Sequence, residues 1–502
     1  MWICAERVNV GGHFWVRVPR VRKLQISRRA VLAGATATAA ATVVAFDPAN
    51  LGWLTAADAE TADTIRVPGL DGELVVDEAS RTEAADDYGH IVHRKPIAVL
   101  RPGSVRDIAT IIKFANHHGL KVATRGQGHS TFGQAQAGSG VVIDSRTLAT
   151  IHRIGTGHAV VDAGVQWLDL IKATLAAGQT PPVATDYLGL SIGGTLSLGG
   201  IGGATSHHGL LVDNVLALEV VTGTGEIVRC TPSIRPDLFH AVLGGLGQFA
   251  VIARATVRLI PAATTARVYH LFYPDLASMT AAQRKALADR RFSYLEGQIT
   301  PTEAGWTYQL EGVMYYTPPS TPDDAALVTD LAPSSTEIVD MPYFAWLNRI
   351  YDLVQQLMAL RMPGPWINVF IPSEATDEYV ASVLAETTPA DAGGVVLLYP
   401  VSRDLIRQPF VRLPDSQVVF LLALLRAVSP PNDAETQRLI AVNRSQYDRA
   451  VAVGGTHYPV GAIPLTEADW HTHYGDQWPA FRAAKRKYDP KNVLTPGQAI
   501  FR

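Results

Sequence analysis

The feature that most constrains the fold is an alternation of short apolar runs with helical patterns, which begins near Pro96. The apolar runs are short enough for buried strands, and the segments between them space their apolar residues as a helix does. Gly119 stands where the first of these helices is expected to stop. The alternation predicts an α/β or α+β domain with buried strands. The expected strands are 97–100, 120–123, 140–144 and 159–161, and the expected helices are 105–118 and 167–175.

Turn chemistry extends this domain, and a second region follows it. Thr222-Gly-Thr-Gly225 lies between two apolar runs and predicts a hairpin, and a further apolar strand is expected at 251–259. From 263 to 450 aromatic residues are denser, and alternating strands are separated by helical stretches. We interpret this region as a second, sheet-plus-helix domain. Its expected strands are 308–316, 367–371, 395–399 and 418–425.

Composition and missing motifs exclude several classes of protein. A chain of 502 residues has room for two to four domains. It has 43 basic and 46 acidic residues and no long basic stretch in its body, which argues against a nucleic-acid partner. Two cysteines exclude a disulfide scaffold and a cysteine-based zinc module. The sequence has no phosphate-binding GxxxxGK[ST] loop and no HExxH metal helix, so no metal site is expected.

The first 59 residues have the pattern of an export signal. They contain seven basic and three acidic residues, and the pair Arg28-Arg29 precedes an uncharged run over 30–46. Ala57-Asp58-Ala59 then supplies a small-residue cleavage site. Paired arginines indicate a twin-arginine signal, whose machinery carries folded proteins to the cell envelope or the exterior. The alternative is an amphipathic or anchoring helix, but the run is shorter than a bilayer span requires, so no stable membrane anchor is expected.

Three glycine-rich loops carry the chemical hypothesis. Arg125-Gly-Gln-Gly-His-Ser130 places a histidine between residues that let the main chain approach a ligand, and 189–203 and 244–247 are further loops of this kind. Such loops offer N–H groups to anionic or carbonyl oxygens. Together they predict a large cofactor held mainly by backbone. The alternative for each loop alone is a tight turn with a satisfied histidine.

These motifs, in this order, resemble the cytokinin dehydrogenase family of the vanillyl-alcohol-oxidase superfamily. The likeness is strong over 93–262, clear over 450–502 and weak between. It implies an α+β, two-domain PCMH-type FAD-binding fold with an inserted substrate domain. The boundaries are then 1–59 for the leader, 60–262 for the first FAD-binding segment, 263–450 for the substrate domain and 451–502 for the returning segment. The motifs are RGQGHS at 125–130, TDYL at 185–188, GGTLS at 193–197, VTGTGE at 221–226, GGLGQF at 244–249 and YDPKNVLTPGQ at 488–498.

The resemblance also implies roles for individual residues. His129 matches the position that bonds covalently to the flavin, and Asp186 matches the catalytic acid–base, whose alternative is a turn aspartate or a helix cap. Glu311 matches a carboxylate that hydrogen-bonds the purine, and its alternative is a solvent-facing strand charge. Cys230 follows an apparent strand and is expected in the core, so a single flavin link is expected. The other implied FAD contacts are Gly126, Gln127, Gly128, Ser130, Gln134, Asp186, Ser191, Ser197, Ile201, Ile252, Tyr458, Thr495 and Gln498.

Three departures from the family pattern bear on the substrate. Leu198-Gly199 replaces the usual Asn-Ala, and Ser206-His-His-Gly209 lacks the usual arginine. Val401-Ser-Arg-Asp404 follows Tyr399-Pro400 without the tryptophan that shapes the adenine slot in the family. The flavin assignment does not depend on these positions, whereas the cytokinin assignment does.

The hypothesis from the sequence is therefore an exported FAD-dependent oxidoreductase. It oxidises a secondary amine, an N6-isoprenoid adenine, to an imine that hydrolyses to adenine and an aldehyde, and Asp186 takes the proton. Its partners are a small-molecule substrate, an electron acceptor (oxygen or a quinone) and the twin-arginine export machinery. One alternative keeps the fold but oxidises an alcohol or carbohydrate with a base on a substrate-domain strand. The other is a secreted flavin- or ligand-binding protein without catalysis.

Overall fold

The computed structural model describes residues 69–501 and five short strands that precede them. The predicted arginine pair, Arg28 and Arg29, and the predicted cleavage site at 57–59 lie outside the described residues. The chain divides into two units, Met1–Ala41 and Thr42–Arg502. In the first unit β1 and β2 pair as an antiparallel hairpin, and all other elements belong to the second. The five early strands are β1 (Glu6–Asn9), β2 (Trp15–Val18), β3 (Val43–Asp47), β4 (Gly52–Thr55) and β5 (Ile65–Arg66).

The first sheet of the second unit has the order β6-β7-β9-β8, and its last three strands are parallel. The predicted strands and the predicted helix between them are confirmed. Asp107 fixes the start of this helix, because its carboxylate closes a capping box with Ser104 and accepts the N–H groups of Asp71 and Gly72 at 2.8 Å. Gly119, at φ 68°, ends it. The elements are β6 (Glu73–Val75), α2 (Glu78–Ala84), β7 (Ala98–Arg101), α3 (Val105–His118), β8 (Val122–Arg125) and β9 (Val141–Asp144).

Two aromatic residues of the predicted leader pack on α3. Phe46 in β3 and Trp53 in β4 are both buried. Their rings lie 5.2 and 4.9 Å from that of Phe114, centroid to centroid. These two strands therefore cover an apolar patch of the first sheet's helix.

The second sheet is a five-stranded antiparallel sheet with the order β10-β11-β15-β13-β14. Helix α5 packs on β15 and so belongs to the core of this region. Cys230, the last residue of β14, is buried, and burial raises the pKa of its thiol to about 12, so the prediction of a core cysteine is confirmed. The elements are β10 (Ile151–Gly155), β11 (His158–Asp162), α4 (Trp167–Leu175), α5 (Ile192–Leu198), α6 (Thr205–His208), β13 (Val215–Thr222), β14 (Ile227–Cys230), α7 (Pro236–Val242), β15 (Ala250–Arg258) and a small pair, β12 (Gln179–Thr180) with β16 (Ile260–Pro261).

The third sheet is antiparallel, with the order β20-β17-β19-β18-β22-β23-β21-β24. Its strands are β17 (Thr265–Tyr273), β18 (Tyr294–Thr302), β19 (Gly305–Tyr316), β20 (Ser335–Pro342), β21 (Ile367–Pro372), β22 (Val396–Ser402), β23 (Val418–Leu424) and β24 (Thr456–His457). The helices of this region are α8 (Leu276–Ala288), α9 (Asp324–Val328), α10 (Tyr343–Leu347), α11 (Tyr351–Ala359), α12 (Ser373–Glu386), α13 (Pro389–Ala392) and α14 (Asp433–Ala452).

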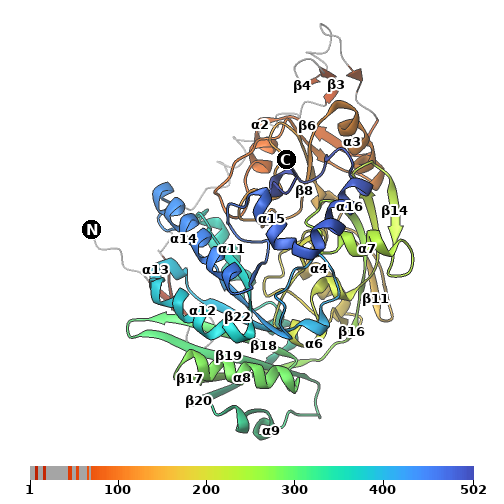
Figure 1. Ribbon diagram of the computed structural model, residues 1–502. Coiled ribbons are helices and arrows are strands. Elements are labelled where there is room, and N and C mark those ends of the chain that lie inside the picture. The colour runs from red at the N-terminus through yellow and green to blue at the C-terminus, as the bar shows by residue number, and fades with distance from the viewer. Residues whose placement is uncertain are drawn as a thin grey trace, which may run out of the picture. The chain divides into compact units, whose positions relative to one another are not determined.

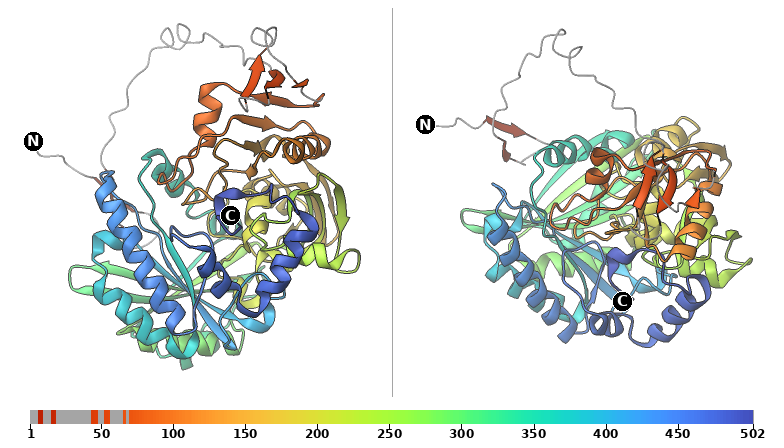
Figure 2. Two further views of the ribbon diagram at one scale, coloured as in Figure 1. Left: turned by 45° about the horizontal axis from the view of Figure 1, so that its top comes forward. Right: turned by 90° about the horizontal axis from the view of Figure 1, so that it is seen from above.

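Helices α8, α12 and α14 cover one face of this third sheet (Figures 1 and 2). Successive side chains of a strand point to opposite faces, so the apolar residues Leu271, Leu295 and Leu310 face these helices. His270, Glu296 and Glu311 consequently point to the other face. The sheet therefore offers a row of ionisable side chains on the side that the three helices leave free.

The C-terminal segment returns to the first sheet. Helices α15 (Glu467–Tyr474) and α16 (Trp478–Tyr488) precede it, and a buried ion pair, Lys485 Nζ to Asp489 at 2.7 Å, closes the second of them. Leu494 then bridges to Val122 in β8, and the Thr495 N–H donates to the Val122 carbonyl at 2.8 Å (Figure 1). Within the residues that the structure describes, no helix combines the length and apolar character needed to cross a membrane.

Candidate active site

Asp186 stands on the loop between β12 and α5 and is held by side chains from the third sheet. Its Oδ1 accepts hydrogen bonds from the Tyr294 hydroxyl at 2.7 Å and from Arg349 Nη2 at 3.0 Å. Its Oδ2 accepts the hydroxyl of Tyr399. The carboxylate caps no helix, and three donors from three different elements fix its orientation. The alternative of a turn or cap aspartate therefore does not describe this residue.

Arg349 links Asp186 to two further carboxyl groups. It lies between α10 and α11, and its guanidinium stacks on the ring of Trp346, 3.8 Å from the centroid. The Nη2 atom is 3.8 Å from Glu296 Oε2 and 3.7 Å from Glu311 Oε1. One cation thus stands among three carboxyl groups, so the cluster cannot hold all three as anions without an excess of negative charge.

Glu296 and Glu311 are directly opposite each other on β18 and β19. Both are buried, with 2% and 4% of their surface exposed. Burial raises the pKa of Glu311 to about 7. Burial also raises the pKa of Glu296, and the neighbouring Asp186 and Glu311 act in the same direction. Glu311 is therefore not the solvent-facing charge that the sequence left as an alternative, and this pair holds protons near neutral pH.

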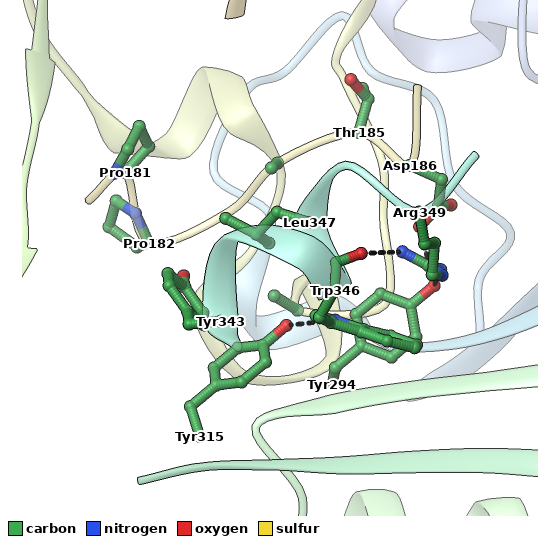
Figure 3. A pocket seen from close by; sticks show the side chains of 12 residues that line it. Pro181, Pro182, Thr185, Asp186, Tyr294, Tyr315, Tyr343, Trp346, Leu347 and Arg349 are labelled. Atoms are coloured by element: carbon green, nitrogen blue, oxygen red, sulfur yellow. Dashed lines mark hydrogen bonds and ion pairs between the residues drawn. The ribbon is translucent and has the colours of Figure 1, made fainter. Parts of the chain in front are cut away.

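A small cavity that is open to solvent begins at Asp186. Figure 3 shows Asp186, Arg349 and Tyr294 at one end of it, with aromatic and proline side chains along the rest. Glu311 is not among its lining residues. Polar groups that converge at one end of a cavity with aromatic walls are typical of small-molecule sites. The other lining residues are Pro181, Pro182, Ala184, Thr185, Ala204, Tyr315, Tyr343, Trp346 and Leu347.

His129 lies in a cage of aromatic rings. Its centroid is 4.2 Å from that of Tyr88, 5.1 Å from that of Tyr187 and 5.7 Å from that of Trp366. Burial lowers the pKa of its imidazole to about 4, so the ring is neutral at physiological pH. Its Nδ1 is buried and has no hydrogen-bond partner among the described residues. A neutral ring with an unengaged nitrogen fits a covalent attachment to flavin, because that nitrogen is free to form the bond.

A buried carboxyl group shapes the loop that carries His129. Asp87 accepts the Gly133 N–H at 2.7 Å, the Gly89 N–H at 3.1 Å and the Ser130 hydroxyl at 3.0 Å. Burial raises the pKa of Asp87 to about 6. Asp87 therefore ties its own segment to the part of the loop that follows His129, and the hydroxyl of Ser130 is engaged within the protein.

The other loops meet the histidine loop. Gln134 Nε2 donates to the Gly461 carbonyl at 3.2 Å, and the Gly126 backbone lies so close to Ser191 that an added Cβ would stand 2.0 Å from its Oγ. Such an approach admits only glycine. A Cβ added at Gly497 would likewise stand 2.2 Å from the carbonyl oxygen of Gly133. The structure thus brings the first glycine loop, the start of α5 and the returning C-terminal segment together.

The remaining predicted flavin residues divide into two groups. Several are engaged in tying backbone segments to one another. Ile201 and Ile252 lie in hydrophobic clusters, and among the described residues the side chain of Gln127 has no hydrogen-bond partner. The tying residues and their partners are Tyr458 with the Gly200 N–H at 3.0 Å, Ser197 with the Gly193 carbonyl at 2.8 Å, Thr495 with the Gly247 carbonyl at 2.8 Å, Gly128 with the Tyr88 N–H at 2.8 Å and Gln498 with the Thr495 carbonyl at 3.4 Å.

Sequence reasoning missed most of the side chains that surround Asp186. Arg349 comes from a segment with weak family likeness and no motif of its own. Tyr294 and Glu296 carried a signal that was not used, since a tyrosine and a glutamate two residues apart share one face of a strand. The tryptophan that shapes the adenine slot in the family is absent after Tyr399, and no residue replaces it there. Trp346, from another element, supplies an indole beside Arg349.

Comparison with known proteins agrees with this arrangement. A family model described as "FAD binding domain" matches residues 96–231, and one described as "Cytokinin dehydrogenase 1, FAD and cytokinin binding" matches residues 300–501. Cytokinin dehydrogenase 9 of Oryza sativa subsp. japonica is 34% identical over 478 residues, covering 86% of this chain and 91% of the rice protein. An uncharacterised oxidoreductase, ORF5 of the fasciation locus of Rhodococcoides fascians, is 40% identical over 439 residues, covering 85% and 99%.

A solved structure shows the same fold. The crystal structure of 6-hydroxy-D-nicotine oxidase from Arthrobacter nicotinovorans superposes with a TM-score of 0.66 and 22% identity. It covers 86% of this chain and 98% of that protein. The predicted α+β, two-domain flavoprotein fold is confirmed.

Proposed function

The chain belongs to the cytokinin dehydrogenase family of FAD-dependent oxidoreductases, and we propose that it oxidises a secondary amine, an N6-isoprenoid adenine, at Asp186. The observation that carries this proposal is the position of Asp186. Its carboxylate stands at the polar end of the cavity, oriented by Tyr294, Arg349 and Tyr399. A secondary amine bound there presents its N–H to a fixed acceptor, as general base catalysis requires.

The chain's own residues account for the proton and for substrate placement. FAD, when bound, accepts the hydride from the carbon next to the nitrogen. Asp186 takes the proton from that nitrogen, and Arg349 stabilises the carboxylate before the transfer. The aromatic wall formed by Trp346, Tyr343 and Tyr315 excludes water from the apolar part of the substrate. The imine leaves and hydrolyses to an aldehyde and adenine.

His129 holds the cofactor in this proposal. Its buried and unpaired Nδ1 supports a covalent link, and the loops around Gly126 and Gly133 supply the surrounding backbone. Since Cys230, the cysteine of the described residues, is buried in the core and not beside this histidine, we expect one link. The electron acceptor is oxygen or a quinone.

A second candidate is oxidation of an alcohol or carbohydrate on the same fold. Its base would stand on a strand of the substrate domain, and Glu296 and Glu311 are carboxyl groups on such strands, the second with a pKa near 7. Both nevertheless lie behind Arg349, and Asp186 alone of the three carboxylates lines the cavity. The amine reaction is therefore the better supported of the two.

Export by a twin-arginine route remains part of the proposal. It rests on Arg28-Arg29 and the small residues at 57–59. Cleavage after Ala59 would remove Phe46 and Trp53 from their contacts with Phe114. The N-terminal sequence of protein recovered from the cell envelope or the medium tests this: a start at residue 60 supports export with cleavage, and an intact leader on cytoplasmic protein contradicts it.

The decisive experiment on the reaction uses isopentenyladenine as the probe. The purified holoprotein is mixed with it in the absence of air, and the visible absorption of the flavin is followed. Rapid bleaching is expected. A protein that stays yellow with isopentenyladenine but bleaches with alcohols or sugars would replace the first candidate by the second.

A further inference from the structure

A row of ionisable side chains crosses the third sheet from its buried centre to its edge. Glu296 in β18 is opposite Glu311 in β19, Glu311 is opposite His270 in β17, and His270 is opposite Glu337 in β20. Residues directly opposite each other point to the same face, with Cβ atoms about 5 Å apart. The four side chains therefore form a continuous line at right angles to the strands, on the face that helices α8, α12 and α14 leave free.

Hydrogen bonds join the inner end of this row to Asp186. The Tyr294 hydroxyl is 2.7 Å from Asp186 Oδ1 and also contacts Glu296 Oε2. One hydroxyl group thus bridges the catalytic carboxylate and the first member of the row. At the outer end, His270 Nδ1 lies 3.5 Å from Glu311 Oε2, and the amide of Gln309 is 2.8 Å from the same ring nitrogen. Glu311 and His270 are thus in contact, and the strand register sets Glu296 beside Glu311 and His270 beside Glu337.

Exposure rises in steps along the row. Glu296 is 2% exposed and Glu311 is 4% exposed, the side chain of His270 is 21% exposed, and Glu337 lies on the exposed edge strand β20. Burial raises the pKa of both inner glutamates, and that of Glu311 to about 7. Glu311 therefore exchanges its proton in the pH range in which a histidine also titrates, and burial holds the proton of Glu296 more firmly.

We propose that this row carries the proton that Asp186 takes from the substrate to the outer edge of the sheet. The proposal rests on Asp186 as the proton acceptor of the proposed function. Asp186 gives its proton to the Tyr294 oxygen as the Tyr294 hydroxyl proton passes to Glu296. Since both glutamates hold protons at rest, Glu311 first passes its proton to His270, which releases one to solvent beside Glu337, and Glu296 gives its own proton to Glu311 as it receives that of Tyr294. One proton enters and one leaves, and every group returns to its starting state.

The charged groups that face the row fit this role. Glu296 faces Asp186, Arg349 and Tyr399, and Glu311 faces Arg349 and Asp186. Arg349 is within 4 Å of both glutamates and limits how many of them carry a proton at once. The competing explanation is that the row only braces Arg349, in which case His270, which does not contact the guanidinium in the described geometry, has no part in proton movement.

The test follows the acid proton of Glu311 in the resting holoprotein. The protein at about pH 6 is mixed into D₂O, and time-resolved infrared spectroscopy records the shift of the carboxylic-acid C=O band as hydrogen is replaced by deuterium. Glu311→Gln identifies the band by removing it. We expect His270→Asn to slow this exchange about tenfold and added imidazole to restore it, because imidazole replaces the lost proton carrier. His471→Asn, on an exposed helix elsewhere, is the matched control and should change nothing.

A second measurement follows the proton during turnover. Isopentenyladenine is mixed with the holoprotein without air in weak buffer, and a pH indicator reports proton release beside flavin bleaching. In His270→Asn we expect bleaching within about twofold of wild type and release delayed about tenfold, again restored by imidazole. Unchanged exchange and unchanged release in both His270→Asn and Glu337→Gln would overturn the path. If isopentenyladenine bleaches no protein, the proposed substrate fails, and the exchange experiment still decides the path.

Discussion

The loop around His129 and the cluster around Asp186 are built from different kinds of chemical groups. Around His129 the chain uses glycine backbones, aromatic rings and one buried carboxyl group, Asp87, whose bonds all stay within the protein. Around Asp186 it gathers a cation, carboxyl groups and tyrosine hydroxyls from the third sheet and the segment after α10. The first region is fixed mainly by shape. The second is charged and shares protons.

This difference indicates which changes each region tolerates. A site made of backbone contacts fails when space or the bonding nitrogen is lost, and charge matters little there. A site made of a shared charge network fails when one charge is removed, because the remaining groups are left buried and unbalanced. Substitutions in the two regions should therefore separate cofactor retention from chemistry.

Replacement of His129 should have the largest effect, and that effect should be confined to attachment of the cofactor. In His129→Ala we expect complete loss of acid-stable flavin, because the buried Nδ1 without a hydrogen-bond partner is the atom proposed to form the bond. Acid precipitation followed by absorption of the pellet measures it, with His471→Ala as the control. Flavin that still resists acid in His129→Ala would contradict the link.

Replacement of Asp186 should lower the rate of the reaction and leave flavin binding unchanged. Asp186→Asn keeps the shape and the oxygen that accepts from Tyr294, but an amide is no proton acceptor. We expect bound yellow flavin and a rate of reduction by isopentenyladenine lowered by about 10²-fold or more. Anaerobic stopped-flow absorption measures the rate, and the exposed Asp415→Asn serves as control. Reduction at the wild-type rate would remove Asp186 from the mechanism.

Replacement of Arg349 tests whether the ionisable groups around Asp186 depend on this cation. Arg349→Met leaves Asp186, Glu296 and Glu311 without their cation, so we expect the free energy of unfolding to fall by about 2–4 kcal/mol at pH 8. The loss should be smaller at pH 5, where the buried glutamates are protonated. Urea unfolding at the two pH values measures this. Arg349→Lys keeps the charge and should recover part of the loss, and equal losses at both pH values would contradict the coupling.

Replacement of Glu311 should have the smallest effect on stability, and the direction of its pH dependence follows directly from its pKa. Its folded pKa of about 7 lies above the value of about 4.3 for an unfolded glutamate, so the folded protein binds more protons between these values. Its contribution to stability is present below the unfolded pKa and is lost as pH rises through about 7. In Glu311→Gln that slope should be absent, a difference on the order of 1–3 kcal/mol at pH 8.

Unfolding curves from pH 4 to pH 8 in wild type and Glu311→Gln measure this slope. Asp87, with its pKa of about 6, contributes a slope of the same sign but remains in both proteins, so the difference isolates Glu311. Glu467→Gln, on the surface of α15, is the control. Parallel curves for wild type and Glu311→Gln would mean that Glu311 is ionised in the folded protein throughout this range.

Local pattern was sufficient for most of the fold. The helix Val105–His118 and its glycine stop were predicted residue for residue from apolar spacing and Gly119, and the capping box in the structure agrees with them. The hairpin around 222–225 followed from its turn residues. The order of the eight-stranded sheet could not be predicted, since β22 lies between β18 and β23 through contacts that no local pattern encodes.

The site divides in the same way. Glycines at 126, 128 and 133 indicate a close approach of backbone segments. The histidine loop could be located from the sequence because its requirements are local. Arg349 is separated from Asp186 by 163 residues and reaches it only through the packing of α10 on the third sheet. A charge network assembled from distant segments leaves no periodic signal, so its members became visible only in three dimensions.

The C-terminal residues that lie against β8 join segments that are far apart in the sequence. Gly497 packs against Gly133, and the Thr495 N–H donates to the Val122 carbonyl, so the residues after α16 support the loop that carries His129. A side chain added at 497 would therefore press on the histidine loop, and a substitution after α16 can disturb the flavin region without replacing any residue of the aromatic cage.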